Sequence, residues 1–171
     1  VNSKTYDGTT AALLNSGSSL TTGLTDGLSV TLPTAGTYNS KDVVTANLVS
    51  FLVGLNSSDG YTVAGGAFGS GSQTKASANI TAKALTVSGL ASASKVYDGT
   101  NAALVTGTAV LQAAIAAGTG SSSDGKAYIG DDVSLTGTAS GTFNDKNVLG
   151  ATRVTFSGLS LSGAQVDNYT L

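Results

Sequence analysis

The side chains that could carry chemistry in this chain are mostly aspartates and lysines. The sequence of 171 residues has 10 acidic and 8 basic residues, no His and no Cys, and every acid is Asp. His and Cys are the usual bases and nucleophiles of enzymes. A pair of carboxylates can also hydrolyse glycosides, but no Asp pair stands apart from turn sequences. We therefore expect no enzyme, no catalytic residue and no cofactor.

A calcium site is the first alternative for the carboxylates. Asp124, Asp131 and Asp132 lie near one another in the sequence, and Ca²⁺ prefers such oxygen ligands. The chain has no Asp-x-Asp-x-Asp-Gly loop. The sequence leaves calcium binding open, and we assign no metal ligand.

An isopeptide cross-link between Lys and Asn or Asp is the second alternative. The recurring lysines are Lys4, Lys95, Lys41 and Lys146. Such a bond needs a third, buried carboxylic acid, and an unpaired buried Lys is costly. Since the chain has no Glu, an Asp would have to serve, and the sequence leaves the cross-link open.

The strongest signal in the sequence is repetition. Residues 4–12, Lys-Thr-Tyr-Asp-Gly-Thr-Thr-Ala-Ala, return at 95–103 as Lys-Val-Tyr-Asp-Gly-Thr-Asn-Ala-Ala. Residues 36–43 return at 141–148, and residues 59–63 return at 167–171, in the same order. Ordered repeats of this length predict tandem copies of one small domain. We place module 1 at residues 1–82 and module 2 at residues 83–171, an organisation that favours a stalk or array.

The repeated Tyr-Asp-Gly-Thr sequence has the composition of a turn. A Tyr at a strand end buries its ring, Asp caps nearby N–H groups, and Gly accepts a positive φ. A second Tyr follows another turn near the end of each module, as at the corners of β-sandwiches. The predicted structural residues are Tyr6, Asp7, Gly8, Tyr61, Tyr97, Asp98, Gly99 and Tyr169. A ligand or metal site around Asp7 and Asp98 is the alternative.

The abundance of Thr, Val, Ser, Gly and Ala favours strands over helices. Leu28–Leu32 alternates apolar and polar residues, as do Val49–Phe51 and Val154–Phe156, and such alternation is typical of half-buried strands. A change of alternation near Leu48 and Val49 predicts a β-bulge. We predict an all-β chain of two tandem antiparallel β-sandwich modules of Ig-like type. β-grasp-like modules are the alternative.

Two segments differ from this pattern. Val110–Gly118 contains good helix formers and ends in Gly, which predicts one short helix. It lies in residues 108–127, an insertion that module 1 lacks, so we expect a surface elaboration. Between the modules, Ile80, Ala82 and Ala84 share one face and Leu85 the other. This switch predicts one stiff strand that serves two cores, whereas the Gly- and Ser-rich residues 64–78 predict a loop.

Charge and hydropathy narrow the class of partner. A net charge of −2 without a basic patch excludes nucleic acid. No apolar run reaches the ~20 residues that a membrane-spanning helix needs, so we expect no membrane insertion. Because Val1 leads directly into the first motif, we expect a piece of a longer exported protein.

The two Tyr-Asp-Gly-Thr motifs, the lead-in Ile80–Val87 and the closing Asn168–Leu171 resemble the YDG repeat of large bacterial exoproteins of the filamentous-haemagglutinin type. Module 1 departs from this pattern because it lacks its own lead-in strand and closes with Asp59–Val63. The resemblance implies adhesins exported by two-partner secretion to the extracellular bacterial cell surface. It implies structural spacer repeats that support attachment, cell–cell contact or biofilm.

The partners that this resemblance implies are neighbouring repeats of the same chain. A host or bacterial surface glycan or protein would bind through another region. The alternative function is an adhesive module that contacts a glycan or protein receptor itself. That alternative needs an exposed aromatic patch, for which Tyr61, Phe68 and Tyr128 are candidates.

Overall fold

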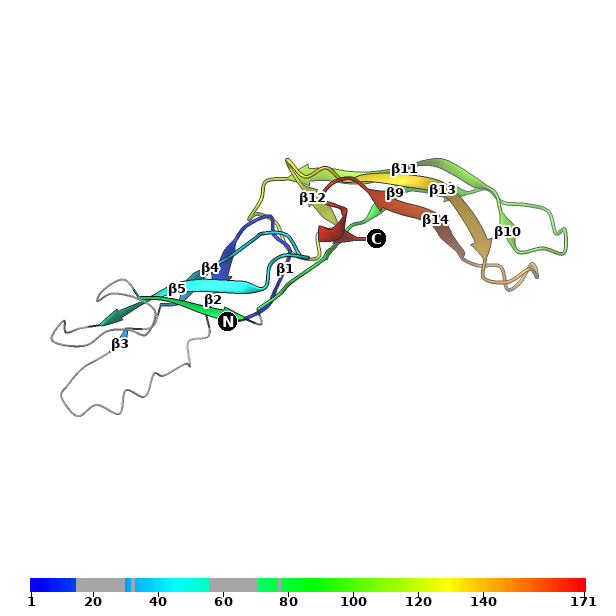
Figure 1. The fold of residues 1–171 in the computed structure, drawn as a ribbon. Helices are drawn as coiled ribbons and strands as arrows, with labels where there is room; N and C mark the ends of the chain where they lie inside the picture. The colour runs from blue at the N-terminus through cyan, green and yellow to red at the C-terminus, as the bar shows by residue number, and fades with distance from the viewer. Residues whose placement is uncertain (15–29, 32, 56–70, 77) are drawn as a thin grey trace. The chain divides into compact units, whose positions relative to one another are not determined.

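Strands dominate the chain because its Thr, Val, Ser and Ala residues alternate between two faces over short stretches. The computed structural model describes residues 1–14, 30–31, 33–55, 71–76 and 78–171 (Figure 1). The predicted all-β class is confirmed. The chain divides into two compact units, unit 1 (Val1–Ala82) and unit 2 (Lys83–Leu171). Tyr61, Phe68 and, within the predicted loop, residues 64–70 and 77 lie outside the described residues. Gly71–Ala76 form a strand, so the loop prediction is wrong for that part.

Unit 1 is built around a long central strand, β5. Its strands are β1 (Lys4–Thr5), β2 (Ala11–Leu13), β3 (Val30–Thr31), β4 (Ala35–Tyr38), β5 (Leu48–Leu55), β6 (Gly71–Ala76) and β7 (Ile80–Thr81). β5 pairs antiparallel with β3, β4 and β6, and β4 pairs with β2. β1 and β7, which lie at opposite ends of the unit's sequence, form a separate parallel pair.

The predicted bulge near Leu48 and Val49 is wrong. The register between β5 and β6 runs without a shift from Leu48 opposite Ala76 to Val53 opposite Gly71. The alternation changes there because β5 begins at Leu48. The residues just before it form the turn that connects β4 to β5.

Unit 2 contains two three-stranded sheets and one two-stranded sheet. Its strands are β8 (Lys83–Ala84), β9 (Val87–Ser92), β10 (Ala102–Ala103), β11 (Val105–Ile115), β12 (Lys126–Tyr128), β13 (Ser134–Phe143), β14 (Val154–Ser162) and β15 (Tyr169–Thr170). The sheet orders are β10-β13-β14 and β12-β11-β9, and β8 pairs with β15. Most pairs are antiparallel, but β11–β12 and β8–β15 are parallel. One 3₁₀ turn covers Val166–Asn168.

The predicted helix at Val110–Gly118 is wrong, because most of that segment belongs to β11. Leu111 lies opposite Val87 of β9, and Ile115 lies opposite Tyr128 of β12. Partners on both sides satisfy the backbone of β11 and outweigh the helix propensity of its Ala and Gln residues. Within the insertion, residues 108–115 thus belong to the central strand of a sheet and residues 126–127 to its edge strand β12. The description of the insertion as a surface elaboration is therefore also wrong.

Paired glycines bend the long strands of unit 2. Gly137 and Gly158 have φ of 89° and 85°, and the register between β13 and β14 shifts next to them. A Cβ on Gly137 would collide with the carbonyl oxygen of Gly158, and a Cβ on Gly158 with that of Thr138. A β-bulge with positive φ and such close backbone approach requires Gly.

The two units build the same local contacts around the repeated sequences. Ala12 lies opposite Gly36 in unit 1, and Ala103 opposite Gly141 in unit 2. In unit 1, the backbone N–H of Asn39, just after β4, donates to the carbonyl oxygen of Leu48 at 2.8 Å. In unit 2, the N–H of Asn144, just after β13, donates to that of Arg153 at 2.9 Å. The repeated sequence thus gives a repeated turn and register.

The strand between the repeats changes its buried face at Ala82, earlier than the sequence predicted. Ile80 is buried in unit 1, whereas Lys83 and Leu85 are buried in unit 2 and Ala84 is exposed. β7 pairs within unit 1 and β8 within unit 2. The stiffness of this junction stays a prediction. Within the described residues, no helix is long and apolar enough to cross a bilayer.

Replacing Gly158 with Ala should destabilise unit 2 by about 2–4 kcal/mol, because positive φ is unfavourable for Ala and its Cβ meets the carbonyl of Thr138. Gly130→Ala is the matched control, because Gly130 also has a positive φ (95°) but open space around it. That control should cost about 1–2 kcal/mol. Urea unfolding followed by circular dichroism measures both, and equal costs would contradict the close-approach argument.

Candidate functional site

The Tyr-Asp-Gly-Thr motif of unit 1 closes on itself through a Lys–Asp–Thr cluster. Lys4 Nζ lies 2.7 Å from Asp7 Oδ1 and donates to the carbonyl oxygen of Thr9 at 2.9 Å. The same Asp7 oxygen accepts the backbone N–H and the hydroxyl of Thr9, each at 2.9 Å. Gly8 between them has φ 75°. The carboxylate therefore caps a tight turn and neutralises the lysine next to it.

Unit 2 repeats this cluster with Lys95, Asp98 and Thr100. Lys95 Nζ lies 2.9 Å from Asp98 Oδ1 and 2.8 Å from the carbonyl oxygen of Thr100. The hydrogen bond from Lys95, followed by those from the backbone and hydroxyl of Thr100, lowers the pKa of Asp98 from 3.8 to about 2. Gly99 supplies φ 79°. In both clusters the Lys and the Asp form an ion pair within the motif. Their structural role stays a prediction.

The tyrosines of the two motifs differ in burial. Tyr6 is 0% exposed, and its hydroxyl accepts a hydrogen bond of 2.9 Å from Lys41 Nζ. Tyr97 is 56% exposed, so its predicted burial is wrong. The reason lies in the flanking strand, because Lys4–Thr5 pairs with β7 whereas Lys95–Val96 forms no strand.

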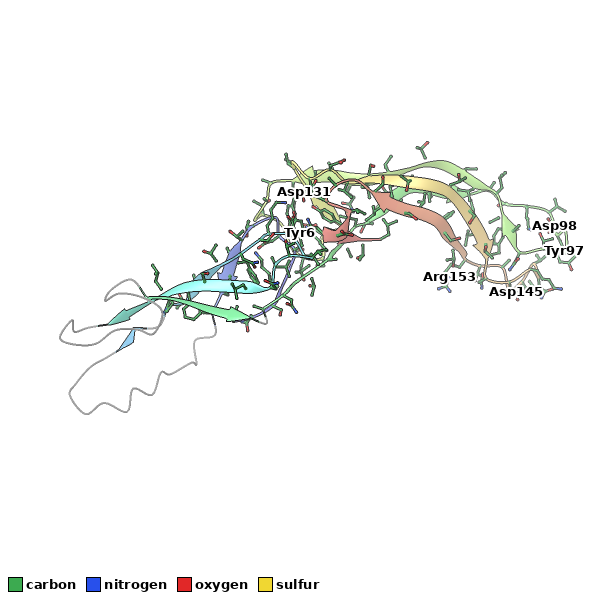
Figure 2. The ribbon with its side chains drawn as sticks, viewed as in Figure 1. Tyr6, Tyr97, Asp98, Asp131, Asp145 and Arg153 are labelled. Atoms are coloured by element: carbon green, nitrogen blue, oxygen red, sulfur yellow. The ribbon has the colours of Figure 1, made fainter. Side chains whose placement is uncertain are left out.

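An open groove surrounds the exposed tyrosine, and we call it the Tyr97 groove. It has a volume of about 220 Å³, and Figure 2 shows Tyr97 and Asp98 at the same end of unit 2 as Asp145 and Arg153. Its lining includes Lys95, Tyr97, Phe143, Lys146, Val148 and Ala151. Val96, Val148 and Leu149, beside or within it, are also exposed. Side chains of this kind are suited to contact another surface.

The other end of unit 2 contains a buried ion pair that sequence reasoning missed. The side chain of Lys83 is 0% exposed, and its Nζ lies 2.9 Å from Asp124 Oδ1 and 3.1 Å from the hydroxyl of Tyr128. The same Nζ is 4.2 Å from the centre of the Tyr128 ring. The available signal was a single Lys inside the apolar segment from Ile80 to Leu85.

The protonation of this pair follows from its hydrogen bonds. Burial alone would lower the pKa of Lys83, but the hydrogen bonds to Asp124 and Tyr128 outweigh it and raise that pKa above 10.5. The hydrogen bond from Lys83, with those from the backbone of Lys126 and Ser121, lowers the pKa of Asp124 to about 2. The pair is ionised near neutral pH and stabilises the Asp124–Gly125 turn against β8.

Tyr169, a predicted structural residue, is buried next to this ion pair. Its hydroxyl donates to Asp131 Oδ2 at 2.6 Å and accepts the backbone N–H of Tyr128 at 2.9 Å. The ring thus connects β15 to β12. The matching Tyr61 of unit 1 lies outside the described residues.

The carboxylates proposed for calcium have different protein partners. Asp124 binds Lys83, Asp131 accepts from Tyr169, and Asp132 Oδ2 accepts the backbone N–H of Ala164 at 3.0 Å. Among the described residues, no group of three His, Cys, Asp or Glu side chains could hold a metal. Of the repeated lysines, Lys4 and Lys95 form ion pairs with the Asp of their own motifs.

Comparison with known proteins gives one result. The model of the YDG domain matches residues 81–171, which is more than half of the chain. No curated protein and no solved structure matches the chain. The match begins at the end of β7 and includes the second copy of the Lys-Tyr-Asp-Gly-Thr motif, the Tyr97 groove and the Lys83 ion pair.

Truncating the two equivalent tyrosines should give unequal results. Tyr6→Ala should destabilise unit 1 by about 3–5 kcal/mol, because it removes a fully buried ring. Tyr97→Ala should destabilise unit 2 by about 1 kcal/mol or less, because an exposed side chain loses little packing. Hydrogen exchange resolved by residue measures each unit separately. Equal effects would show that Tyr97 is buried after all.

Acid should weaken unit 2 over a defined range. Because the folded pKa of Asp124 lies below its ordinary value of 3.8, its ionised form stabilises the fold above about pH 4. That stabilisation is lost as the pH falls through about 2. Asp124→Asn should therefore make the free energy of unfolding less dependent on pH in this range, as measured by urea titrations at successive pH values.

Asp98→Asn is the matched comparison for this carboxylate. Its pKa is also about 2, so the acid dependence should again decrease. At neutral pH, however, Asp98→Asn should lower the melting temperature less than Asp124→Asn, because Lys95 reaches water and Lys83 does not. The opposite order would contradict the assignment of Lys83 as the buried member of an ion pair.

Proposed function

The chain belongs to the YDG domain family, and from this premise we propose that it forms structural spacer repeats of a secreted bacterial surface adhesin. Its location would be extracellular, on the cell surface, in an exoprotein of the filamentous-haemagglutinin type exported by two-partner secretion. The repeats would hold a binding region away from the cell and support attachment, cell–cell contact or biofilm. Their nearest partners would be neighbouring repeats.

The observation that carries this proposal is the direction of the outermost strands in each unit. In unit 1, β1 and β7 pair in parallel, and in unit 2, β8 and β15 do the same. Since parallel strands run in the same direction, the chain enters at one end of the pair and leaves at the other. A pull along the chain therefore loads the bonds between the two strands together, in shear.

Backbone hydrogen bonds connect each of these terminal pairs. Lys4 N–H donates to the carbonyl of Asn79 at 3.2 Å, and Tyr6 N–H to that of Thr81 at 2.8 Å. In unit 2, Leu85 N–H donates to the carbonyl of Thr170 at 2.7 Å. The buried Lys83 ion pair and the Tyr169 hydroxyl add side-chain bonds to the pair in unit 2. Such an arrangement suits a domain that must transmit tension.

Single-molecule pulling tests the spacer function. The chain has no Cys, so two introduced cysteines define the points of attachment. A handle at Lys83 would disturb β8, whereas Leu171 lies just after β15. We therefore choose Val1 and Leu171 and expect two separate unfolding events. The control has handles at Ser134 and Ser162, paired ends of β13 and β14, where force opens the antiparallel hairpin one bond at a time.

End-to-end pulling should require the higher force. Similar or lower force than in the control would remove the mechanical argument for a spacer. A change in ionic strength should have little effect, because the terminal pairs depend mainly on backbone bonds. The measurement also reports whether both units resist load.

A second candidate function is an adhesive module that binds a glycan or a protein itself. The observation in its favour is the Tyr97 groove, where Tyr97 lies exposed near Val148. Tyr128, which the sequence offered as an exposed aromatic, is buried, so that expectation is wrong. Saturable binding of a glycan by the isolated chain, abolished by Tyr97→Ala, would favour this candidate over the spacer.

A further inference from the structure

We propose that unit 2 binds an extended segment, supplied by a further repeat of the same kind, in the Tyr97 groove and along the free edge of β14. This inference rests on the proposed spacer function and gives it a mechanism of assembly. The incoming segment would form the strands that β6 and β7 form in unit 1. Such a segment is an extended peptide. Its backbone groups would hydrogen-bond to the edge of β14, and its small or β-branched side chains would fill the Tyr97 groove.

Unit 1 shows what the occupied site contains. β7 lies beside β1, and its Ile80 is buried together with the preceding Ala78 and with Tyr6. The hydroxyl of Tyr38 donates to the carbonyl of Asn79 at 3.4 Å. The segment from Ala78 to Thr81 thus accepts hydrogen bonds from Tyr38 and from the backbone of β1 and of Tyr6. Its Ala78 and Ile80 are buried, as are Tyr6 and Tyr38.

The corresponding groups of unit 2 are less covered. Phe143 replaces Tyr38, Ala151 replaces Ala46 and Val154 replaces Val49, and each of the three is only partly buried where its counterpart is buried. Lys146, the counterpart of Lys41, is exposed and makes no hydrogen bond with Tyr97 among the described contacts. Phe143, Ala151, Val154 and Tyr97 are therefore all less covered than their counterparts in unit 1.

The edge of β14 shows the same difference. In unit 1, β5 has β4 on one side of Val49 and Ser50, and β6 on the other. In unit 2, which the structure describes throughout, β14 pairs with β13 alone. An edge strand presents unpaired N–H and C=O groups that another strand can bind. Arg153 and residues 154–158 of β14 correspond to residues 48–53 of β5, the part that pairs with β6.

Unit 1 indicates a peptide segment as the occupant, because β6 pairs with β5 there and β7 pairs with β1. Two strands in sequence, an antiparallel one on β14 and a parallel one beside Lys95–Tyr97, would fill both uncovered features at once. The amide of Tyr97 would donate to the incoming backbone, as Tyr6 donates to Thr81. Phe143 lacks the hydroxyl of Tyr38. The hydrogen bond that Tyr38 donates to the carbonyl oxygen of Asn79 in unit 1 would therefore have no equivalent in unit 2.

The experiment supplies the segment from the chain itself. A copy of residues 64–82 is fused after Leu171, which keeps the spacing that separates Val63 from β6 and β7 in unit 1. Fusion raises the effective concentration of the segment and avoids the weak binding of a free peptide. Hydrogen exchange is then measured at Tyr97 and at Val154–Gly158.

We expect the amides of Tyr97 and of the β14 edge to exchange at least about tenfold more slowly in the fused chain. The matched control carries Ile80→Asp in the fused copy, which places a charge where unit 1 buries an apolar side chain, and it should restore fast exchange. Tyr6 is the internal reference, because its amide is already bonded in unit 1 and should not change.

Three outcomes would overturn the proposal. Exchange is unchanged by the fusion, or it slows equally with the Asp-containing copy, or it slows with protein concentration in the unfused chain, which would identify a second copy as the occupant. The pulling experiment is independent of this result. Failure of the fusion therefore leaves the spacer function standing, and failure under force leaves the binding of the segment standing.

Discussion

The parallel pairing of β1 with β7 decides which side chains of unit 1 are buried. Two short strands from opposite ends of the unit's sequence must meet before Tyr6, Ala78 and Ile80 leave water. The β1–β7 pair has few backbone hydrogen bonds, so its stability depends on the apolar side chains that are buried with it. The closure of the unit and the burial of its motif are thus one event.

Charge in this chain is sparse and is used locally. Each Lys–Asp pair of the repeated motif crosses a single turn and remains partly exposed, so its contribution to stability is small. Lys83 differs because its ammonium group is fully buried and needs both Asp124 and Tyr128. An ion pair of this kind fixes a geometry more than it adds stability, since removing either partner leaves a buried charge unpaired.

The contrast between the units connects stability with function. In unit 1, β7 pairs with β1 and the Tyr6 ring of the motif is buried. At the Tyr97 groove the same sequence presents a ring and aliphatic side chains to solvent, and exposed apolar groups next to a strand edge favour association. If each repeat supplied the strand that covers the groove of the repeat before it, the stability of every unit in an array would depend on the next unit.

The sequence by itself determined the all-β class, the repeated turns and the residues that build them, because these depend on local preferences of Gly, Asp and β-branched residues. Alternation and repetition are local properties, and a single chain displays them. Tertiary structure decided the rest. Val110–Gly118 has helical preference but lies largely in β11, because β9 and β12 offer partners that an isolated segment lacks.

The two motif tyrosines show the same limit at a single side chain. Tyr6 and Tyr97 have nearly identical neighbours in sequence, yet one is buried and the other is not. Burial depends on a strand far along the chain, and local sequence carries no information about whether that strand is present. The partner of Lys83 could not be predicted from the sequence for the same reason, because long-range pairing brings Asp124 next to it.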